Sequence, residues 1–109
     1  MPSLVAAPGR AREYVPTYLG CLTIFTLFRR CNTMKIFATH GNFERVYKML
    51  KEIYDNLLNP EVQTDLTPAQ KNFIQTYVWT IMIQDPKDSA KYIGELEQYT
   101  FILLNNQQE

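Results

Sequence analysis

Apolar residues recur at steps of three and four between residues 42 and 104, and this spacing marks the buried face of an α-helix. Helix-start signals divide this stretch into three parts. Asn42 is a favourable N-cap, and Pro68 and Pro86 each follow a capping residue and fit the first helical position. Pro60 ends the first part. The pattern therefore predicts a mainly α fold built on a module of three amphipathic helices.

The first 33 residues differ in composition from the rest of the chain. They hold four arginines, no lysine and one acid, Glu13, so their formal charge is +3, against −3 for residues 34–109. We therefore expect an N-terminal extension over residues 1–33, acting as a leader or a packing segment, and a helical domain over residues 34–109. A single domain that spans the whole chain is the alternative.

An apolar run over residues 18–28 dominates this extension. It is shorter than the roughly 20 residues that a membrane-spanning helix needs. Its β-branched and aromatic residues favour a strand over 21–28, which could pair with residues 34–39 in a short β-hairpin. An extra helix, giving four packed elements, is the alternative, because periodicity does not settle short apolar runs. As further alternatives, residues 18–28 direct the chain to an organelle or associate with a membrane.

Composition and motifs argue against several classes of function. Eleven basic and eleven acidic residues give a net charge of zero, and the lysines alternate with acids, so we do not expect nucleic acid as a partner. The sequence has no glycine-rich phosphate loop, nucleophile elbow or paired metal motif, so we expect no cofactor, no metal and no enzymatic activity. Two arginines, rather than a small-residue cleavage site, follow the apolar run, which favours a cytoplasmic protein over a secreted one.

Two cysteines and one histidine are the remaining candidates for chemistry. Cys21, Cys31 and His40 lack the close ligand pairs of a zinc site, and we expect free, mostly buried thiols, with a disulfide conceivable in a hairpin. Residues 35–41 resemble the strand-to-helix histidine of phosphocarrier proteins. That resemblance implies a phosphocarrier-type enzyme acting through His40 as an alternative function. A solvated histidine at the junction before a helix is the reading that we prefer.

Tyrosines repeat at a spacing of one heptad on two of the predicted helices. A heptad places side chains on one helix face, and tyrosine joins an apolar ring to a hydroxyl that reaches water or a partner. A small helical module also has limited interior volume, so some large apolar side chains must contact another chain or the N-terminal segment. We therefore predict a non-catalytic protein–protein interaction module that binds a partner protein or a second copy of itself. The candidate contact residues are Tyr47, Tyr54, Trp79, Met82, Tyr92 and Tyr99.

Overall fold

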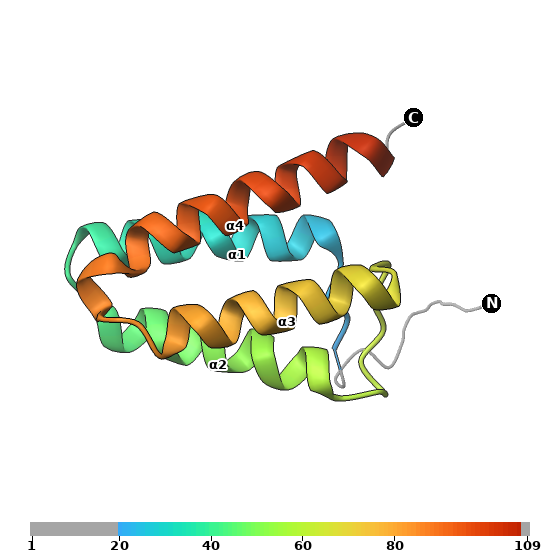
Figure 1. The fold of residues 1–109 in the computed structure, drawn as a ribbon, viewed down its shortest axis with the longest axis horizontal. Helices are drawn as coiled ribbons and strands as arrows, with labels where there is room; N and C mark the ends of the chain where they lie inside the picture. The colour runs from blue at the N-terminus through green and yellow to red at the C-terminus, as the bar shows by residue number, and fades with distance from the viewer. Residues whose placement is uncertain (1–19, 108–109) are drawn as a thin grey trace.

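Four helices make up the described part of the chain, residues 20–107, in the computed structural model (Figure 1). Each helix runs antiparallel to the one before it, so the bundle has an up-and-down topology. The expected mainly α fold is confirmed, with four elements rather than three. The helices are α1 (Ile24–Thr39), α2 (Phe43–Leu58), α3 (Pro68–Met82) and α4 (Pro86–Gln107).

Helix α1 replaces the β-hairpin that the apolar run had suggested, so the hairpin expectation was wrong and the extra helix is what forms. Strand propensity spans only about 1 kcal/mol between residue types and depends on context. Burial of a whole helix face outweighs it, because a fully buried Leu or Ile contributes about 1.5–3 kcal/mol. The buried residues of α1 follow helical steps along one face: Ile24, Leu27, Cys31, Met34 and Ala38.

The expected boundary between residues 33 and 34 lies inside α1. Residues 24–33 and residues 34–39 are therefore parts of one continuous helix. Residues 1–19, which belong to the predicted extension, lie outside the described residues. Helix α1 makes its most extensive packing contact with α4, and it also packs against α2.

Hydrogen bonds to the first turn and a glycine after the last turn determine where α1 begins and ends. The Thr23 hydroxyl accepts a hydrogen bond from the backbone N–H of Thr26 at 3.1 Å. The Asp65 carboxylate, from the loop between α2 and α3, accepts from the backbone N–H of Ile24 at 2.9 Å. At the other end Gly41 has a φ of +75°, the left-handed conformation in which glycine commonly ends a helix. The chain can therefore turn directly into α2.

The predicted starts of the other three helices are confirmed. The Asn42 side chain accepts from the backbone N–H of Arg45. Thr67 and Gln70 form a reciprocal capping box with Pro68 at the first helical position. The Asp85 carboxylate accepts from the backbone N–H of Lys87 at 2.9 Å. These caps satisfy amide groups that have no partner within the helix itself.

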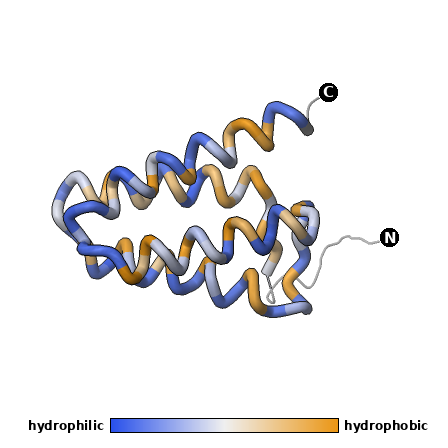
Figure 2. Tube along the Cα trace, in the orientation of Figure 1, coloured by the Kyte–Doolittle hydropathy of each residue, from blue (hydrophilic) through white to orange (hydrophobic). Residues whose placement is uncertain are grey.

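The core lies between the four helices and is closed at one end by the loop that joins α2 to α3. Hydrophobic residues alternate with hydrophilic ones along each helix (Figure 2). Val62 and Leu66 in that loop are buried, and so is Leu22, whose backbone N–H donates to the carbonyl of Gln63 at 2.8 Å. Val62 and Leu66 thus complete the core from this loop. The segment before α1 and the loop thus hold one another in place.

Candidate functional site

Four of the six candidate contact residues lie along the seam between α2 and α3. Tyr47 and Trp79 are each 49% exposed, and Tyr54 and Met82 are half-buried. The rings of Tyr54 and Trp79 are in contact across the seam, with centroids 5.7 Å apart. We call Tyr47, Tyr54, Trp79 and Met82 the α2–α3 face. Leu58 and Ile83 add exposed apolar surface at the ends of the same two helices.

The α2–α3 face forms because the apolar arc of each helix is wider than its core-facing stripe. On α2 the fully buried residues are Val46, Leu50, Ile53 and Leu57. Tyr47 and Tyr54 follow the first and third of these by one position, which rotates them about 100° toward α3. Helix position therefore explains why these rings lie at the rim of the core and not inside it.

A small pocket of about 40 Å³ opens at one end of this face. Phe43, Tyr47 and Met82 line it together with Pro86 at the start of α4. Pockets for drug-sized ligands are roughly 300–1,000 Å³, so this one is far too small for such a ligand. Its size suits one inserted side chain from another protein.

The other two candidates, Tyr92 and Tyr99, lie on the opposite side of α3, along the seam with α4. The half-buried Tyr99 ring packs against the Phe73 ring in a tilted arrangement, with centroids 4.7 Å apart. The structure therefore does not bring all six predicted residues onto one surface. Phe73, which is 47% exposed, is the member of this second cluster that the heptad argument missed. Its i,i+4 spacing to Tyr77 was the available signal.

Polar contacts hold the second cluster in place. The Tyr77 hydroxyl donates a hydrogen bond to the Glu95 carboxylate at 2.5 Å. Burial raises the pKa of Tyr77 well above its usual value, and the hydrogen bond to Glu95 and its negative charge add to this effect. The Lys91 ammonium lies over the Tyr92 ring, 5.8 Å from its centroid. Because Tyr77 is already engaged with Glu95 and the Tyr92 ring with Lys91, the seam between α3 and α4 is a weaker candidate for binding.

The two cysteines are free and differ in environment. Cys21 is exposed and Cys31 is fully buried in α1, so no disulfide joins them. Burial raises the pKa of Cys31 to about 12, and the nearby Glu97 carboxylate raises it further than Lys35 lowers it. A thiol held neutral in this way is a poor nucleophile. Cys31 is therefore a core residue, and only Cys21 is available to reagents in solution.

His40 is the C-cap residue of α1, and its side chain is exposed. The junction at His40 connects two helices, because residues 34–39 are the last turns of α1 and not a strand. The strand-to-helix arrangement on which the phosphocarrier resemblance depended is therefore not present. Within residues 20–107 no group of three or more histidine, cysteine or acidic side chains is arranged to hold a metal ion.

The apolar run that suggested membrane association contributes mainly to the core. Leu22, Ile24 and Leu27 are each at most 1% exposed, whereas Phe25 is 52% exposed. No helix among residues 20–107 combines the length and the hydropathy needed to cross a bilayer. Residues 18 and 19 of the run lie outside the described residues.

Comparison of the chain with models of protein families, with curated proteins and with solved structures finds no match. The site must therefore be interpreted from its own geometry.

Proposed function

We propose that this chain is a non-catalytic interaction module that binds a partner protein through the α2–α3 face. The observation that carries the proposal is the half-exposed Trp79, whose ring packs against the Tyr54 ring. Tryptophan and tyrosine are enriched among the residues that dominate binding energy at protein interfaces. Two such rings left partly in water raise the free energy of the free protein, and burial against a partner's apolar surface would recover that free energy.

An amphipathic helix is the partner element that fits the shape of this face. Tyr47 and Leu58 are eleven residues apart on α2, with Tyr54 between them, which corresponds to about 16 Å of helix and roughly three turns. A helix lying along the α2–α3 seam would present anchors at steps of three and four to this row of side chains. The small pocket beside Tyr47 would take one of those anchors. The neighbouring Lys51 and Asp55 pair with each other at 3.2 Å, so they leave no net charge for a partner to neutralise.

Site-specific photo-crosslinking tests the proposal. A benzophenone amino acid replaces Tyr47 in the full chain, and the matched control carries it at Ile36, which is 59% exposed on α1. In cells that produce the protein, we expect a discrete cross-linked partner from position 47 but not from position 36. The substitution Trp79→Ala should abolish that product. Identical products from both positions, or a product unaffected by Trp79→Ala, would contradict the proposal.

Self-association through the same face is the other outcome of this experiment. Trp79 is the only tryptophan in the chain, so its fluorescence reports directly on this surface. A concentration-dependent blue shift of its emission, together with a doubled mass by light scattering, would identify a second copy as the partner. A monomer with unchanged emission would leave a different protein as the expected ligand.

A further inference from the structure

The groove between α1 and α2 is a second surface, separate from the α2–α3 face. A depression between the two helices is lined by Thr33 and Phe37 of α1 and by Arg45 and Lys48 of α2. It adjoins a second depression on α1, with which it shares Thr33, and a third at the start of α2, with which it shares Arg45 and Lys48. Thr26 and Phe37 are eleven residues apart on α1, which corresponds to about 16 Å. The groove is therefore elongated and open to solvent, and it is not a compact cavity.

Positive charge concentrates along this groove. Arg29 and Arg30 line it from α1, and Arg45 and Lys48 line it from α2. Glu44 and Glu52 are the acids among its lining residues, so four basic and two acidic side chains give a formal charge of +2.

The basic side chains of the groove have no carboxylate partner among residues 20–107. Lys35 and Lys51, by contrast, each pair with an acid, Glu97 at 2.7 Å and Asp55 at 3.2 Å. The Nη1 atom of Arg30 is buried and has no hydrogen-bond partner. A buried donor without a partner is unfavourable, and an incoming carboxylate oxygen would satisfy it.

Apolar surface lies between the charges. Phe37 and Met49 are half-buried and line the middle of the groove. The guanidinium of Arg45 lies over the Phe37 ring, 5.2 Å from its centroid, which holds this charge at the edge of the groove. The groove therefore presents cations along its edges and an apolar patch at its centre.

We propose that the α1–α2 groove binds an acidic, amphipathic peptide segment of a partner protein. Carboxylates of the segment would pair with Arg30, Arg45 and Lys48, and one of its apolar side chains would cover Phe37. A nucleic-acid strand fits less well, because its unbroken row of phosphates would face Glu44 and Glu52, whereas a peptide can place uncharged side chains opposite them. The proposal concerns a surface that the α2–α3 face does not include, so either can fail without the other.

Fluorescence anisotropy with the full chain tests the proposal. The probe is a fluorescein-labelled peptide of repeated Glu-Glu-Leu units, and its matched control contains Gln-Gln-Leu units. We expect saturable binding of the acidic peptide only, weakening as NaCl rises from about 50 to about 300 mM. In amide-resolved NMR, the shifts should concentrate in residues 26–52.

Charge-matched variants locate the site. The double variant Arg30→Gln/Arg45→Gln should weaken binding about tenfold, because two charge pairs are lost. Lys87→Gln/Lys91→Gln removes the same charge from α4 and should leave the affinity within about twofold. Lys48→Glu, a reversal at an exposed position, gives a second test in case Arg30→Gln disturbs folding. The Trp79→Ala variant should bind the peptide normally, which separates this surface from the α2–α3 face.

Four results would overturn the proposal. They are absence of saturable peptide binding, equal weakening by the two charge-matched double variants, NMR shifts centred outside α1 and α2, and tighter binding of labelled oligothymidine than of the acidic peptide. The last result would identify a general polyanion site.

Discussion

Leu27→Ala tests whether the segment before residue 34 belongs to the folding unit. The Leu27 side chain is fully buried in α1, within the stretch whose composition had suggested a separate extension. Replacing a buried Leu with Ala typically costs about 2–5 kcal/mol, because burial is lost and a cavity remains. Since Leu27 has no exposed surface, we expect a loss of about 3 kcal/mol in the free energy of unfolding.

This loss would be large for a domain of this size. Small domains have total stabilities of about 5–10 kcal/mol, so one substitution would remove a third or more of it. Urea unfolding followed by circular dichroism at 222 nm measures the change. With a denaturant slope of about 1.5 kcal/mol/M, the midpoint should fall by about 2 M.

Phe25→Ala is the matched control on the same helix. Phe25 is also apolar but is 52% exposed, and alanine favours helix more than phenylalanine does. We expect its effect to stay below about 1 kcal/mol. If Leu27→Ala changes the midpoint no more than Phe25→Ala does, then α1 does not belong to the cooperative unit and the packing argument is refuted.

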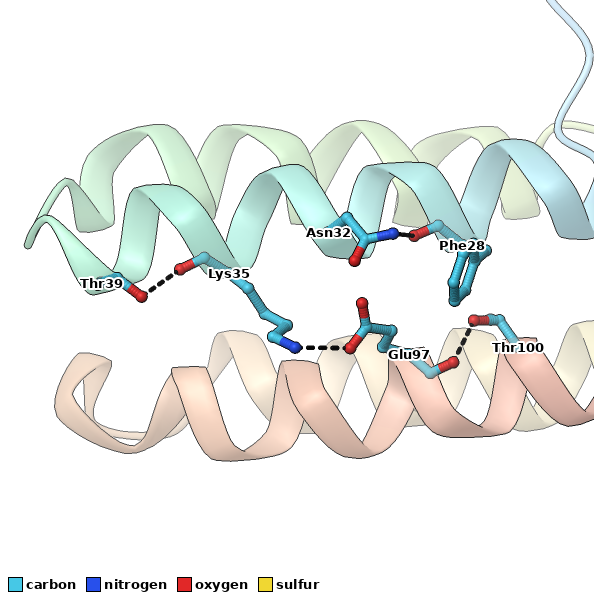
Figure 3. A network of polar contacts seen from close by, with 6 residues as sticks. All are labelled: Phe28, Asn32, Lys35, Thr39, Glu97 and Thr100. Carbon is cyan, nitrogen blue, oxygen red and sulfur yellow. Dashed lines mark hydrogen bonds and ion pairs between the residues drawn. The ribbon is translucent and has the colours of Figure 1, made fainter.

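Three further predictions concern single contacts. Burial raises the folded-state pKa of Cys31 from 9.0 to about 12, so its contribution to stability is complete below pH 9 and is lost as the pH rises toward 12. At pH 10 this loss should be on the order of 1 kcal/mol, and the urea midpoint of Cys31→Ala should depend less on alkaline pH than that of the unsubstituted chain. Lys35→Met leaves Glu97, whose side chain is 9% exposed, without its ion-pair partner (Figure 3). It should lower the free energy of unfolding by about 1–2 kcal/mol. In a double-mutant cycle the loss should be smaller when Glu97→Gln accompanies Lys35→Met. Gly41→Ala forces a side chain into a left-handed conformation, and thermal unfolding should show a loss of about 1 kcal/mol even though no atom obstructs the added methyl group.

Helices α2, α3 and α4 could be predicted from the sequence because each begins with a local signal. A cap side chain and a proline at the first helical position act within one turn, so their effect does not depend on the rest of the fold. Thr23 is an equally good cap for α1, but β-branched residues such as Ile24 follow it at once. The helical character of α1 depends on its burial against α4. Neither that packing nor the hydrogen bond that Asp65 accepts from Ile24 can be seen in a local stretch of sequence.

The six candidate contact residues lie along two seams of the bundle and not on one surface. Heptad spacing shows that Tyr47 and Tyr54 share a face of α2, and that Tyr92 and Tyr99 share a face of α4. It does not show which neighbouring helix each face meets. In the bundle α3 lies between α2 and α4, so the tyrosines of α2 and those of α4 meet opposite sides of α3. Trp79 contacts Tyr54 on one side, and Phe73 contacts Tyr99 on the other. Spacing along one helix therefore predicts a surface only when the neighbouring helices are also known.

The change in composition along the chain separates the first two helices from the last two helices. Residues 20–58 hold six basic and three acidic residues, whereas residues 59–107 hold three basic and six acidic ones. The first of these halves therefore carries a formal charge of +3, and the second, which includes Glu61 and Asp65 in the loop before α3, carries −3. Within residues 20–107 one ion pair joins the two halves, from Lys35 on α1 to Glu97 on α4. Most of the positive charge thus remains in solvent on α1 and α2, which is why the groove between them is the place where an acidic partner would gain most.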